Sequence, residues 1–295
     1  MKFALITFRY SVDAHIGATD GPDALLNSGL ADLLRDEGHE LLGTLHTELG
    51  AEEELAYGAW NRIGLANARL ARLVSQAIKD QAFPLVLETN CYAALGVLAG
   101  LQSAAAQMSA RLGMVWIDAH GDCNTPETTL SGMLSGMPVA MATGMCLHRL
   151  RRQAGLDPPI APRDVVMVCV RANDPLEREL IDQAGIEIVP VADVKGDCRR
   201  LQTAMQRLSE AVDLIYVHFD IDALDPCELA NLRLTEPDGP TRMELAAAVK
   251  MIMGHPKAAA FGVSDINPER DVEGQIIRSA FAVIRGAIEG RASGA

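Results

Sequence analysis

Aromatic residues are scarce in this sequence and make up only 4% of its 295 positions. Hydrophobic residues still reach 49%, so a sizeable core must be filled mainly by Ala, Leu, Val and Ile. Basic residues are also in the minority: 26 Lys and Arg stand against 39 Asp and Glu, a formal net charge of -13. This balance disfavours nucleic acids and anionic membranes as partners and suits a small cationic substrate.

Long hydrophobic runs and closely spaced cysteine pairs are missing as well. No stretch reaches the roughly 18 uninterrupted apolar residues of a membrane-spanning helix. The N-terminal MKFALITFRY lacks the extended apolar region and small-residue cleavage site of a signal peptide. The six cysteines are scattered without a CxxC pair, which predicts free thiols in a reducing compartment. We therefore expect a cytoplasmic protein that has no membrane partner.

Short apolar runs alternate with longer stretches of helical periodicity along the chain. The strand candidates are residues 3–7, 40–44, 84–87, 114–118, 165–170, 187–191, 214–220 and 261–265. The helix candidates are residues 22–37, 59–79, 92–111, 175–183, 200–212, 241–253 and 274–288. This alternation is typical of a parallel sheet covered by helices on both faces. We predict one α/β domain over residues 1–295, with a loop at 50–57 and a frayed tail at 291–295.

Two of the predicted strands, MVWID and LIYVHFD, are almost continuously apolar and end in aspartate. In open α/β sheets, sites gather at the carboxyl ends of such strands. The first strand leads into Asp118, His120 and Asp122, whose i, i+2, i+4 spacing in an extended chain turns all three side chains to one side. Two carboxylates and an imidazole suit Mn²⁺, Mg²⁺, Fe²⁺ or Zn²⁺, although a solvated strand exit would have the same composition.

The second strand ends in HFDIDALDP, which places Asp220 and Asp222 at the same i, i+2 spacing. Burying several carboxylates without a cation is costly, and a cation between the two clusters would offset that cost for both. His218 precedes Asp220 by two residues on the same strand face. It is either an outer partner of such a site or a hydrogen-bonded core histidine.

The segments around both clusters resemble those of the ureohydrolase family, which includes arginases and agmatinases. DAHGD followed by CNTPETTLSGMLSGMP resembles the family pattern DAHxD…NTP…TSG…GxP, and FDIDALDP resembles FDxDxxDP. Residues 17–22, 171–177 and 265–268 resemble the GxxxGP, RxxDPxE and ExNP segments. The matches occur in the family's order across nearly the whole chain.

The resemblance implies a three-layer α/β fold with a central, mainly parallel sheet of about eight strands and two metal ions, most often Mn²⁺. Asp118 and Asp220 would bridge both ions, Asp122 would complete the shell of one, and His120 and Asp222 that of the other. The metal pair would activate a water that attacks a guanidino carbon, and urea and an amine would be released. Family members are commonly trimers or hexamers, so the resemblance also implies a homo-oligomer.

Several residues match family positions that contact the substrate. Asn124, Ser131, Asp174 and Glu177 match positions that hold the amino-acid end of arginine, the two acids by its free α-amino group. Asp265 stands where the family has a glutamate that contacts the guanidinium, and its side chain is one methylene shorter. Read from the residues alone, the Asp-Pro-x-Glu segment at 174–177 is equally an ordinary helix start.

The sequence departs from the family pattern at three positions. Cys91 falls where the family has a metal-binding histidine, and it either binds the metal through a softer thiolate or is buried and inert. Ser135 falls where the family has a histidine that shuttles protons, a task that a hydroxyl alone cannot perform near neutral pH. Met133 replaces an asparagine that contacts the substrate carboxylate. With Asp122 and Asp265, Ser135 completes our set of candidate catalytic residues.

Cysteine at position 91 together with NTPETT after DAHGD resembles one subgroup of the family, the Nω-hydroxy-L-arginine amidinohydrolases of D-cycloserine biosynthesis. A hydroxyguanidine gives hydroxylamine-type products, whose lower basicity eases departure without a strong acid. We therefore expect hydrolysis of arginine or Nω-hydroxy-L-arginine. The alternatives are a hydrolase of agmatine or of a formimino or guanidino acid, and a non-catalytic protein that keeps the fold.

Overall fold

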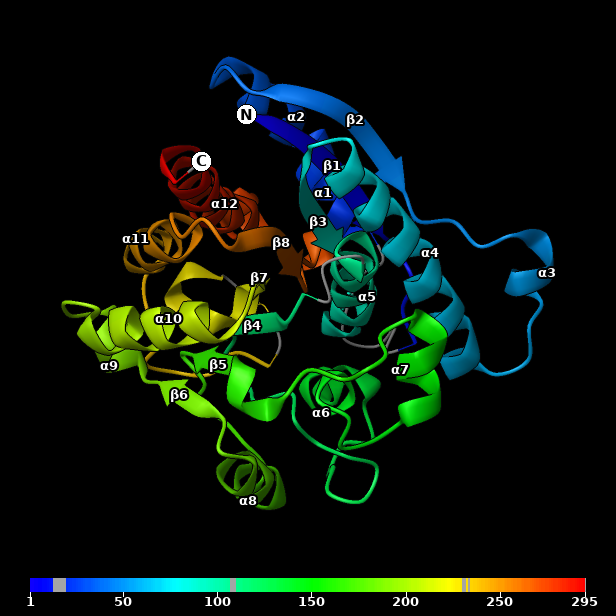
Figure 1. Cartoon of the computed structure of the whole chain (residues 1–295). Helices are drawn as coiled ribbons and strands as arrows, with labels where there is room; N and C mark the ends of the chain where they lie inside the picture. The colour runs from blue at the N-terminus through cyan, green and yellow to red at the C-terminus, as the bar shows by residue number, and fades with distance from the viewer. Residues whose placement is uncertain (13–19, 107–109, 230–231, 233, 295) are drawn as a thin grey trace.

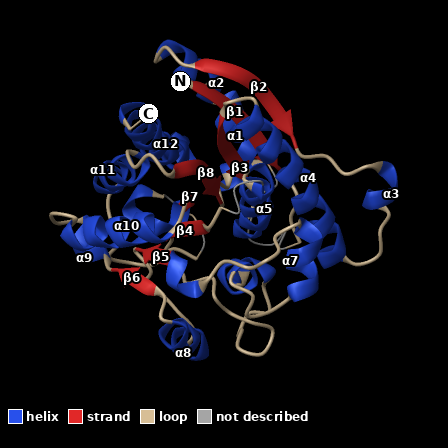
Figure 2. Cartoon of the chain, viewed as in Figure 1, coloured by secondary structure: helices blue, strands red, loops and turns tan. Residues whose placement is uncertain are grey.

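Eight strands form one sheet in the computed structural model, which describes residues 1–12, 20–106, 110–229, 232 and 234–294. The strand order is β2-β1-β3-β8-β7-β4-β5-β6, and every neighbouring pair is parallel (Figures 1 and 2). The strands are β1 (Lys2–Phe8), β2 (Glu40–His46), β3 (Phe83–Glu88), β4 (Leu112–Ile117), β5 (Val165–Val168), β6 (Glu187–Val189), β7 (Leu214–Asp220) and β8 (Ala258–Ser264). All eight strand predictions are confirmed, and the sheet is entirely rather than mainly parallel.

Helices cover both faces of this sheet, as its near-continuous burial requires. One face packs against α4 (Ala59–Lys79), α5 (Ala94–Ala104), α6 (Pro138–Ala142), α7 (His148–Ala154) and α8 (Pro175–Ala184). The opposite face packs against α1 (Gly21–Asn27), α2 (Leu30–Asp36), α9 (Val191–Val194), α10 (Arg199–Ala211), α11 (Arg242–Met253) and α12 (Gln275–Ser293). The predicted three-layer architecture is therefore confirmed (Figure 1).

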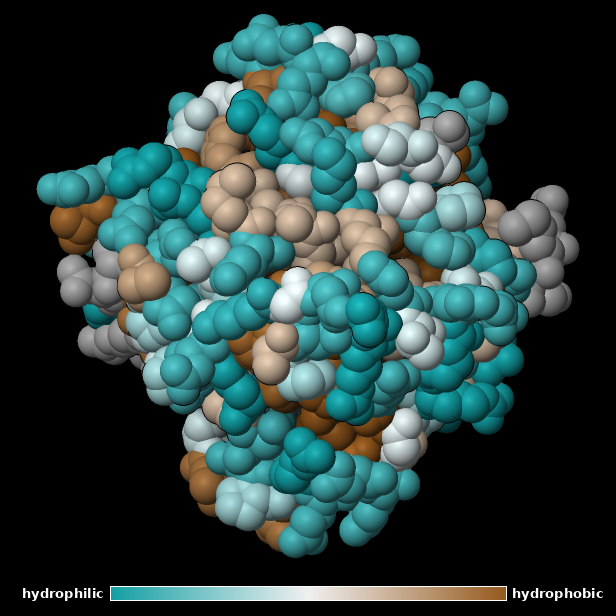
Figure 3. All heavy atoms as spheres, turned by 90° about the vertical axis from the view of Figure 1, so that its left-hand side faces the viewer, coloured by the Kyte–Doolittle hydropathy of each residue, from teal (hydrophilic) through white to brown (hydrophobic). Residues whose placement is uncertain are grey.

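Helix α10 illustrates how the sequence pattern sets this arrangement. Leu201, Ala204, Met205 and Leu208 recur at helical spacing and are buried against the sheet. The positions between them are exposed and mostly charged or polar. The face of the molecule that carries α10 is accordingly covered mainly by hydrophilic side chains (Figure 3). Among the described helices, none is both long and apolar enough to cross a bilayer.

The helix, loop and tail predictions were wrong in four places. The predicted helix 22–37 is two helices, because Gly29 adopts a left-handed φ of 91° between α1 and α2. The predicted loop 50–57 contains the short helix α3 (Ala51–Glu54), and the predicted tail is helical, since α12 runs to Ser293. The predicted helix 92–111 ends as α5 at Ala104, and residues 107–109 lie outside the described part of the chain.

The four central strands place their carboxyl ends side by side. In the order β3-β8-β7-β4 they lead directly into Cys91, Asp265, Asp222 and Asp118. These residues come from positions as far apart as 91 and 265 in the chain, and the parallel topology brings them to one edge of the sheet.

Close packing of α11 against α12 yields a test of this architecture. A Cβ on Gly290 would lie 2.2 Å from the backbone oxygen of Lys250, so the Gly290→Ala variant must push the two helices apart. We expect a loss of about 1–3 kcal/mol in the free energy of unfolding, measured by urea denaturation, despite the higher helix propensity of alanine. Arg285→Ala on the exposed side of α12 should change it by less than about 0.5 kcal/mol. Equal effects of the two substitutions would contradict this packing.

Candidate active site

The predicted site residues line one cavity of about 540 Å³ at the carboxyl ends of the central strands. All twelve candidates border it: Cys91, Asp118, His120, Asp122, Asn124, Ser131, Ser135, Asp174, Glu177, Asp220, Asp222 and Asp265. Met133 borders it too. The structure thus brings the candidates together, while the role assigned to each of them stays a prediction.

The segment after β4 is not extended throughout, although the predicted i, i+2, i+4 arrangement requires an extended chain. His120 forms an isolated bridge with Ala172 of the chain beyond β5, but Asp122 turns into the left-handed region with a φ of 47°. The Asp122 side chain still borders the cavity. The backbone N–H of Val139 donates to the carbonyl of Asp122 at 2.9 Å and holds the turn. The convergence of these side chains depends on this turn rather than on strand alternation.

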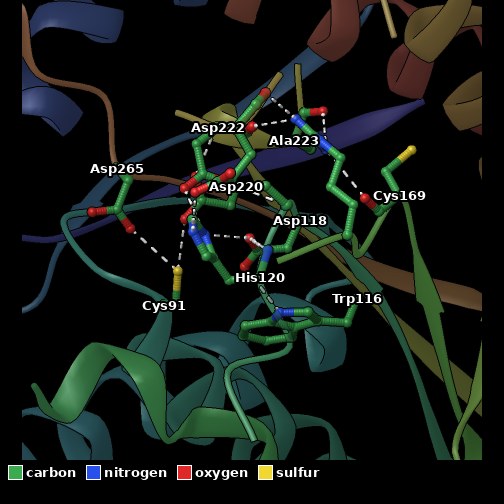
Figure 4. Close-up of polar contacts among 12 residues, drawn as sticks. Cys91, Trp116, Asp118, His120, Cys169, Asp220, Asp222, Ala223 and Asp265 are labelled. Carbon is green, nitrogen blue, oxygen red and sulfur yellow. Dashed lines mark hydrogen bonds and ion pairs between the residues drawn. The ribbon is translucent and has the colours of Figure 1, made fainter. Parts of the chain in front are cut away.

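The ligand candidates gather in clusters, and Figure 4 shows the side chains of Cys91, Asp118, His120, Asp220 and Asp222 turned toward a common centre. One cluster contains Asp118, His120 and Asp222, and another contains Cys91, Asp118 and Asp122. In each cluster, one ligand atom from every residue lies within 4.8 Å of the others. Asp118 belongs to both clusters, as a carboxylate that bridges two ions would.

Burial sets the electrostatics of the cluster. Burial, followed by the charge of Asp222, raises the pKa of Asp118 to about 8. Burial also raises the pKa of Asp122 and of Asp220 well above the ordinary value, with Asp118 and Asp222 respectively as the next causes. The pKa values rise because too little positive charge is present to offset the carboxylates. The oxygen-rich donor set and this excess of buried negative charge both fit two divalent cations.

His120 is the cationic partner that these carboxylates do have. Its Nδ1 lies 3.0 Å from Asp222 Oδ2 and 3.5 Å from Asp118 Oδ1. Burial alone would lower the pKa of His120, but the two carboxylates outweigh it and raise the pKa. Burial alone would raise the pKa of Asp222, but the pairing with His120 outweighs it and lowers the pKa. A metal ion between His120 and Asp222 would take over this charge pairing.

Asp265 follows β8 with a left-handed φ of 61° and is held from two sides. Asn90 Nδ2 donates to its Oδ1 at 3.1 Å, and the Cys91 thiol donates to its Oδ2 at 3.2 Å. Burial raises the pKa of Asp265. The carboxylate borders the cavity and lies next to the ligand candidates, where a guanidinium would complete its charge pairing.

Asp174 and Glu177 border the cavity and also start α8. Asp174 is the N-cap, and Glu177 Oε2 accepts from its backbone N–H at 3.0 Å, which completes a capping box. The other oxygen of Glu177 accepts from the backbone of Cys123 at 2.8 Å. Asp174 Oδ2 accepts from Asn124 Nδ2 at 3.2 Å. The helix-start interpretation of this motif is therefore confirmed, and the cavity lining keeps the substrate prediction open for Asp174 in particular.

Ser131 and Ser135 lie on the loop that crosses the mouth of the cavity. Ser131 is exposed, and its Oγ lies 3.3 Å from Thr129 Oγ1. Ser135 lies in a single 3-10 turn, Leu134–Gly136, and its side chain is half-buried. Among the described lining residues, His120 is the only histidine. No second imidazole is therefore available there for proton transfer.

Three further residues shape the site, although the sequence did not predict a role for them. Glu236 borders the cavity, and its Oε1 lies 3.9 Å from His120 Nε2, but nothing in its loop segment marks it. Arg171 donates to the carbonyls of Cys169, Ala223, Glu236 and Pro237 and so ties the segments that follow β5 and β7 together. Ser264, one residue before Asp265, could have been found by extending the strand-end argument to β8.

Comparisons with known proteins point to one family. The arginase family model matches residues 2–289. The chain is 30% identical to the arginase of Bacillus caldovelox over 276 residues, 91% of each chain, and 30% identical to that of Bacillus subtilis (strain 168) over 278 residues, 92% of each. A crystal structure of arginase from Bacillus subtilis matches with a TM-score of 0.86 at 26% identity and covers 98% of both chains. Formimidoylglutamase from Bacillus subtilis shares the fold, with a TM-score of 0.76 at 19% identity.

The raised pKa of Asp118 predicts how metal-free protein responds to pH. Its folded pKa of about 8 lies above the ordinary value of 3.8, so the folded state retains a proton that the unfolded chain has lost. Stability should therefore fall as pH rises from about 5 to about 8, by up to about 1.4 kcal/mol per pH unit for each retained proton. We expect Tm to fall over this range and Mn²⁺ to raise Tm more at the higher pH.

Thermal unfolding of chelator-treated protein, with and without added Mn²⁺, measures both effects. The Asp118→Asn variant is the matched control, because it lacks the proton-binding group and its metal-free Tm should depend less on pH. A metal-free Tm that rises toward pH 8 would contradict the predicted excess of buried negative charge.

Proposed function

The chain belongs to the arginase family, and from this premise we propose that it is a binuclear-metal amidinohydrolase that cleaves the guanidino group of an arginine-like amino acid. Members of this family are hydrolases that act on C–N bonds of linear amidines. The observation that carries the proposal is the position of Asp265, whose half-buried side chain borders the same cavity as both ligand clusters.

Two divalent cations, for which Mn²⁺ is typical of this family, are the cofactors of the proposed reaction. Asp118 and Asp220 would bridge the pair, Cys91 and Asp122 would hold one ion, and His120 and Asp222 the other. When bound, the two cations supply the Lewis acidity that lowers the pKa of water toward neutrality. Trp116 Nε1 donates to Asp118 Oδ2 at 3.0 Å, and the backbone N–H of Asp222 donates to Asp220 Oδ1 at 2.8 Å. These hydrogen bonds fix the orientation of both bridging carboxylates.

Asp265 would pair with the guanidinium and present its central carbon to water. Asn90 holds the carboxylate in place before the substrate arrives, which reduces the entropic cost of orientation. Addition of water to the central carbon and cleavage of its bond to the side-chain nitrogen give a diamino acid and urea from arginine. The same cleavage of Nω-hydroxy-L-arginine gives hydroxyurea, and cleavage at the hydroxylated nitrogen instead gives hydroxylamine and a ureido acid.

The mouth of the cavity would hold the amino-acid end of the substrate. Asp174 carries a negative charge suited to an α-ammonium, and Asn124 Nδ2 holds its carboxylate in position. Ser131 offers a hydroxyl for the α-carboxylate, while Met133 offers no hydrogen-bond donor to it. An amino acid with a guanidino side chain fits these contacts better than a guanidino acid that lacks the α-amino group.

Proton transfer to the leaving group distinguishes the two substrates within this class. His120 is the only histidine among the described lining residues, and it lies between carboxylates of the ligand cluster. A strongly basic leaving amine needs an acid near it, and the Ser135 hydroxyl is too weak to be that acid. A hydroxyguanidine can expel a less basic nitrogen, which favours Nω-hydroxy-L-arginine as substrate over arginine.

The Asp265→Asn variant tests the proposed guanidinium contact. Loss of one charge from a buried pair should lower kcat/KM by about 100-fold or more, because such pairs contribute roughly 2–5 kcal/mol. Urea, hydroxyurea and hydroxylamine are quantified with arginine and with Nω-hydroxy-L-arginine, and bound metal is counted on the same samples. Asp182→Asn on the exposed side of α8 is the control. Unchanged kcat/KM at full metal content would remove Asp265 from the mechanism.

Asp174→Asn tests recognition of the α-amino group. We expect kcat/KM to fall about 10-fold or more for the preferred amino acid, as loss of one charged hydrogen bond costs about 1.5–3 kcal/mol. For 5-guanidinopentanoic acid, which lacks that amino group, the same substitution should change kcat/KM little. Equal losses on both compounds would assign Asp174 only to the start of α8. Agmatine, which lacks the carboxylate, completes the panel, and no product from any compound at full metal content would favour a non-catalytic protein.

A further inference from the structure

A chain of buried polar side chains lies beneath the cavity and reaches the ligand clusters from behind. It runs from Glu88, at the end of β3, through Tyr216 and His218 on β7 to Ser264 on β8. Glu88 is 1% exposed and the other three are 0% exposed. Tyr216 lies 2.7 Å from Glu88 and 3.0 Å from His218, and His218 Nε2 lies 3.3 Å from Ser264 Oγ. Polar groups this deeply buried need hydrogen-bond partners, and each of these four side chains finds its partner in the next one.

The hydrogens along this chain fix the orientation of the His218 ring. Tyr216 has one hydroxyl hydrogen and donates it to Glu88 Oε1, so its oxygen can only accept from His218 Nδ1. The same Nδ1 lies 3.4 Å from Glu88 Oε2, an oxygen that has no hydrogen-bond partner within the described part of the chain. Nδ1 therefore carries a hydrogen, and Nε2 is the nitrogen that faces Ser264 and the cavity floor.

Four donor atoms have the spacing of a metal shell: two line the cavity, on Cys91 and Asp220, and two lie beneath it, on His218 and Ser264. Cys91 Sγ lies 2.9 Å from Asp220 Oδ2 and 3.2 Å from Ser264 Oγ, which itself lies 3.2 Å from Asp220 Oδ2. One ligand atom each from Cys91, His218 and Asp220 lies within 4.8 Å of the other two. Metal–ligand bonds of about 2.0–2.3 Å place tetrahedral ligands roughly 3.2–3.8 Å apart. The separations among these donor atoms are close to the edge lengths of such a tetrahedron.

The surroundings of His218 match those of a metal-binding histidine. Such histidines usually donate their second ring N–H to a carboxylate, which fixes the ring and raises the basicity of the ligating nitrogen. In this protein, Tyr216 and Glu88 lie next to the second ring nitrogen, His218 Nδ1. Trp116 stacks on the imidazole with a centroid distance of 3.8 Å and an interplanar angle of 14°, so the ring plane is fixed as well.

Gly262 provides the space that this arrangement needs. A Cβ at this position would lie 2.2 Å from the Tyr216 hydroxyl and 2.3 Å from Glu88 Oε1. Any larger residue on β8 would therefore displace the two groups that orient His218. The glycine, the stacked tryptophan and the buried glutamate come from three different strands and all serve one imidazole.

We propose that Cys91, His218 and Asp220 form an inner cation shell at the base of the cavity, where His218 lies beneath the lining residues Cys91 and Asp220, with His218 Nε2 as a direct metal ligand and Ser264 beside it. A thiolate, an imidazole and a carboxylate suit Zn²⁺ or Fe²⁺ better than a shell of oxygens alone does. This inference deepens the proposed function and rests on it only for the presence of a divalent cation in the cavity. The ion on the Cys91 side then has a mixed sulfur, nitrogen and oxygen shell.

Cobalt-substituted protein tests the proposal without any activity measurement. Chelator-treated protein labelled with ¹⁵N-histidine is titrated with Co²⁺, and paramagnetic proton NMR counts the exchangeable imidazole N–H signals shifted by the ion. We expect two such signals, from His120 and from His218 Nδ1, and a sulfur-to-cobalt charge-transfer band from Cys91. In the His218→Gln variant one signal should vanish, and Co²⁺ affinity should fall by more than the roughly 10- to 100-fold that loss of an outer partner costs.

Control variants separate ligation from folding. His148→Gln, at an exposed position that starts α7, should leave both signals and the affinity unchanged. Cys91→Ser should remove the charge-transfer band and keep both imidazole signals. Glu88→Gln should keep both signals and weaken Co²⁺ binding about 10- to 100-fold, which tests the same chain if His218→Gln does not fold.

A single shifted imidazole signal in the wild-type protein with full cobalt content would overturn the proposal and leave His218 as a core histidine. This outcome requires no variant to fold. Failure of the proposed function looks different: two metals and two imidazole signals without any amidine hydrolysis would keep the inner shell and reject the substrate class. No bound cobalt at all would reject both.

Discussion

Four buried aspartates and a half-buried fifth at the edge of one sheet require positive charge, and much of this structure is arranged around that requirement. Asp118, Asp122, Asp220, Asp222 and Asp265 share a cavity with His120, which pairs with two of them, while Arg171 borders the same cavity and donates to loop carbonyls. Burial raises the pKa of four of them, which means that the metal-free cluster holds protons where cations would otherwise bind. Divalent ions would remove this cost, and the cavity would then be neutral enough to admit the proposed cationic substrate and to orient it.

The parallel sheet is what makes such a concentration of charge possible. The central strands are mostly apolar along their length, and their aspartates stand where the strands leave the sheet, so these acids accumulate at one edge. Helix starts and loops then complete the wall: Asp174 and Glu177 cap α8 while they border the cavity, and Arg171 binds loop carbonyls that would otherwise lack donors. Groups that stabilise the scaffold and groups suited to the substrate are thus partly the same residues.

A second polar layer lies below the cavity and connects the scaffold to the ligand candidates. Glu88, Tyr216 and His218 are buried in a region where unpaired polar groups would be strongly destabilising, and each is held by the next. Trp116 links this layer to the carboxylates by stacking on His218 and donating to Asp118. Rigid support of this kind keeps ligands near their binding positions before any ion arrives, which strengthens metal binding.

The sequence by itself determined the eight strands, their parallel arrangement and the acid-ended runs at β4 and β7, because apolar periodicity and strand-end carboxylates are local patterns. It also predicted the members of the cavity, since the spacing of the motifs resembles one family along the whole chain. Local pattern was not enough at Gly29, where a left-handed turn splits a helix, or at Asp122, whose turn redirects the chain.

Only the tertiary structure decided how Glu88, His218, Ser264 and Gly262 meet. They come from three strands, and nothing in their own segments indicates that one glycine makes room for a carboxylate beside an imidazole. Contacts between distant segments depend on strand order and register, which are set by packing of the whole sheet rather than by any single stretch of sequence.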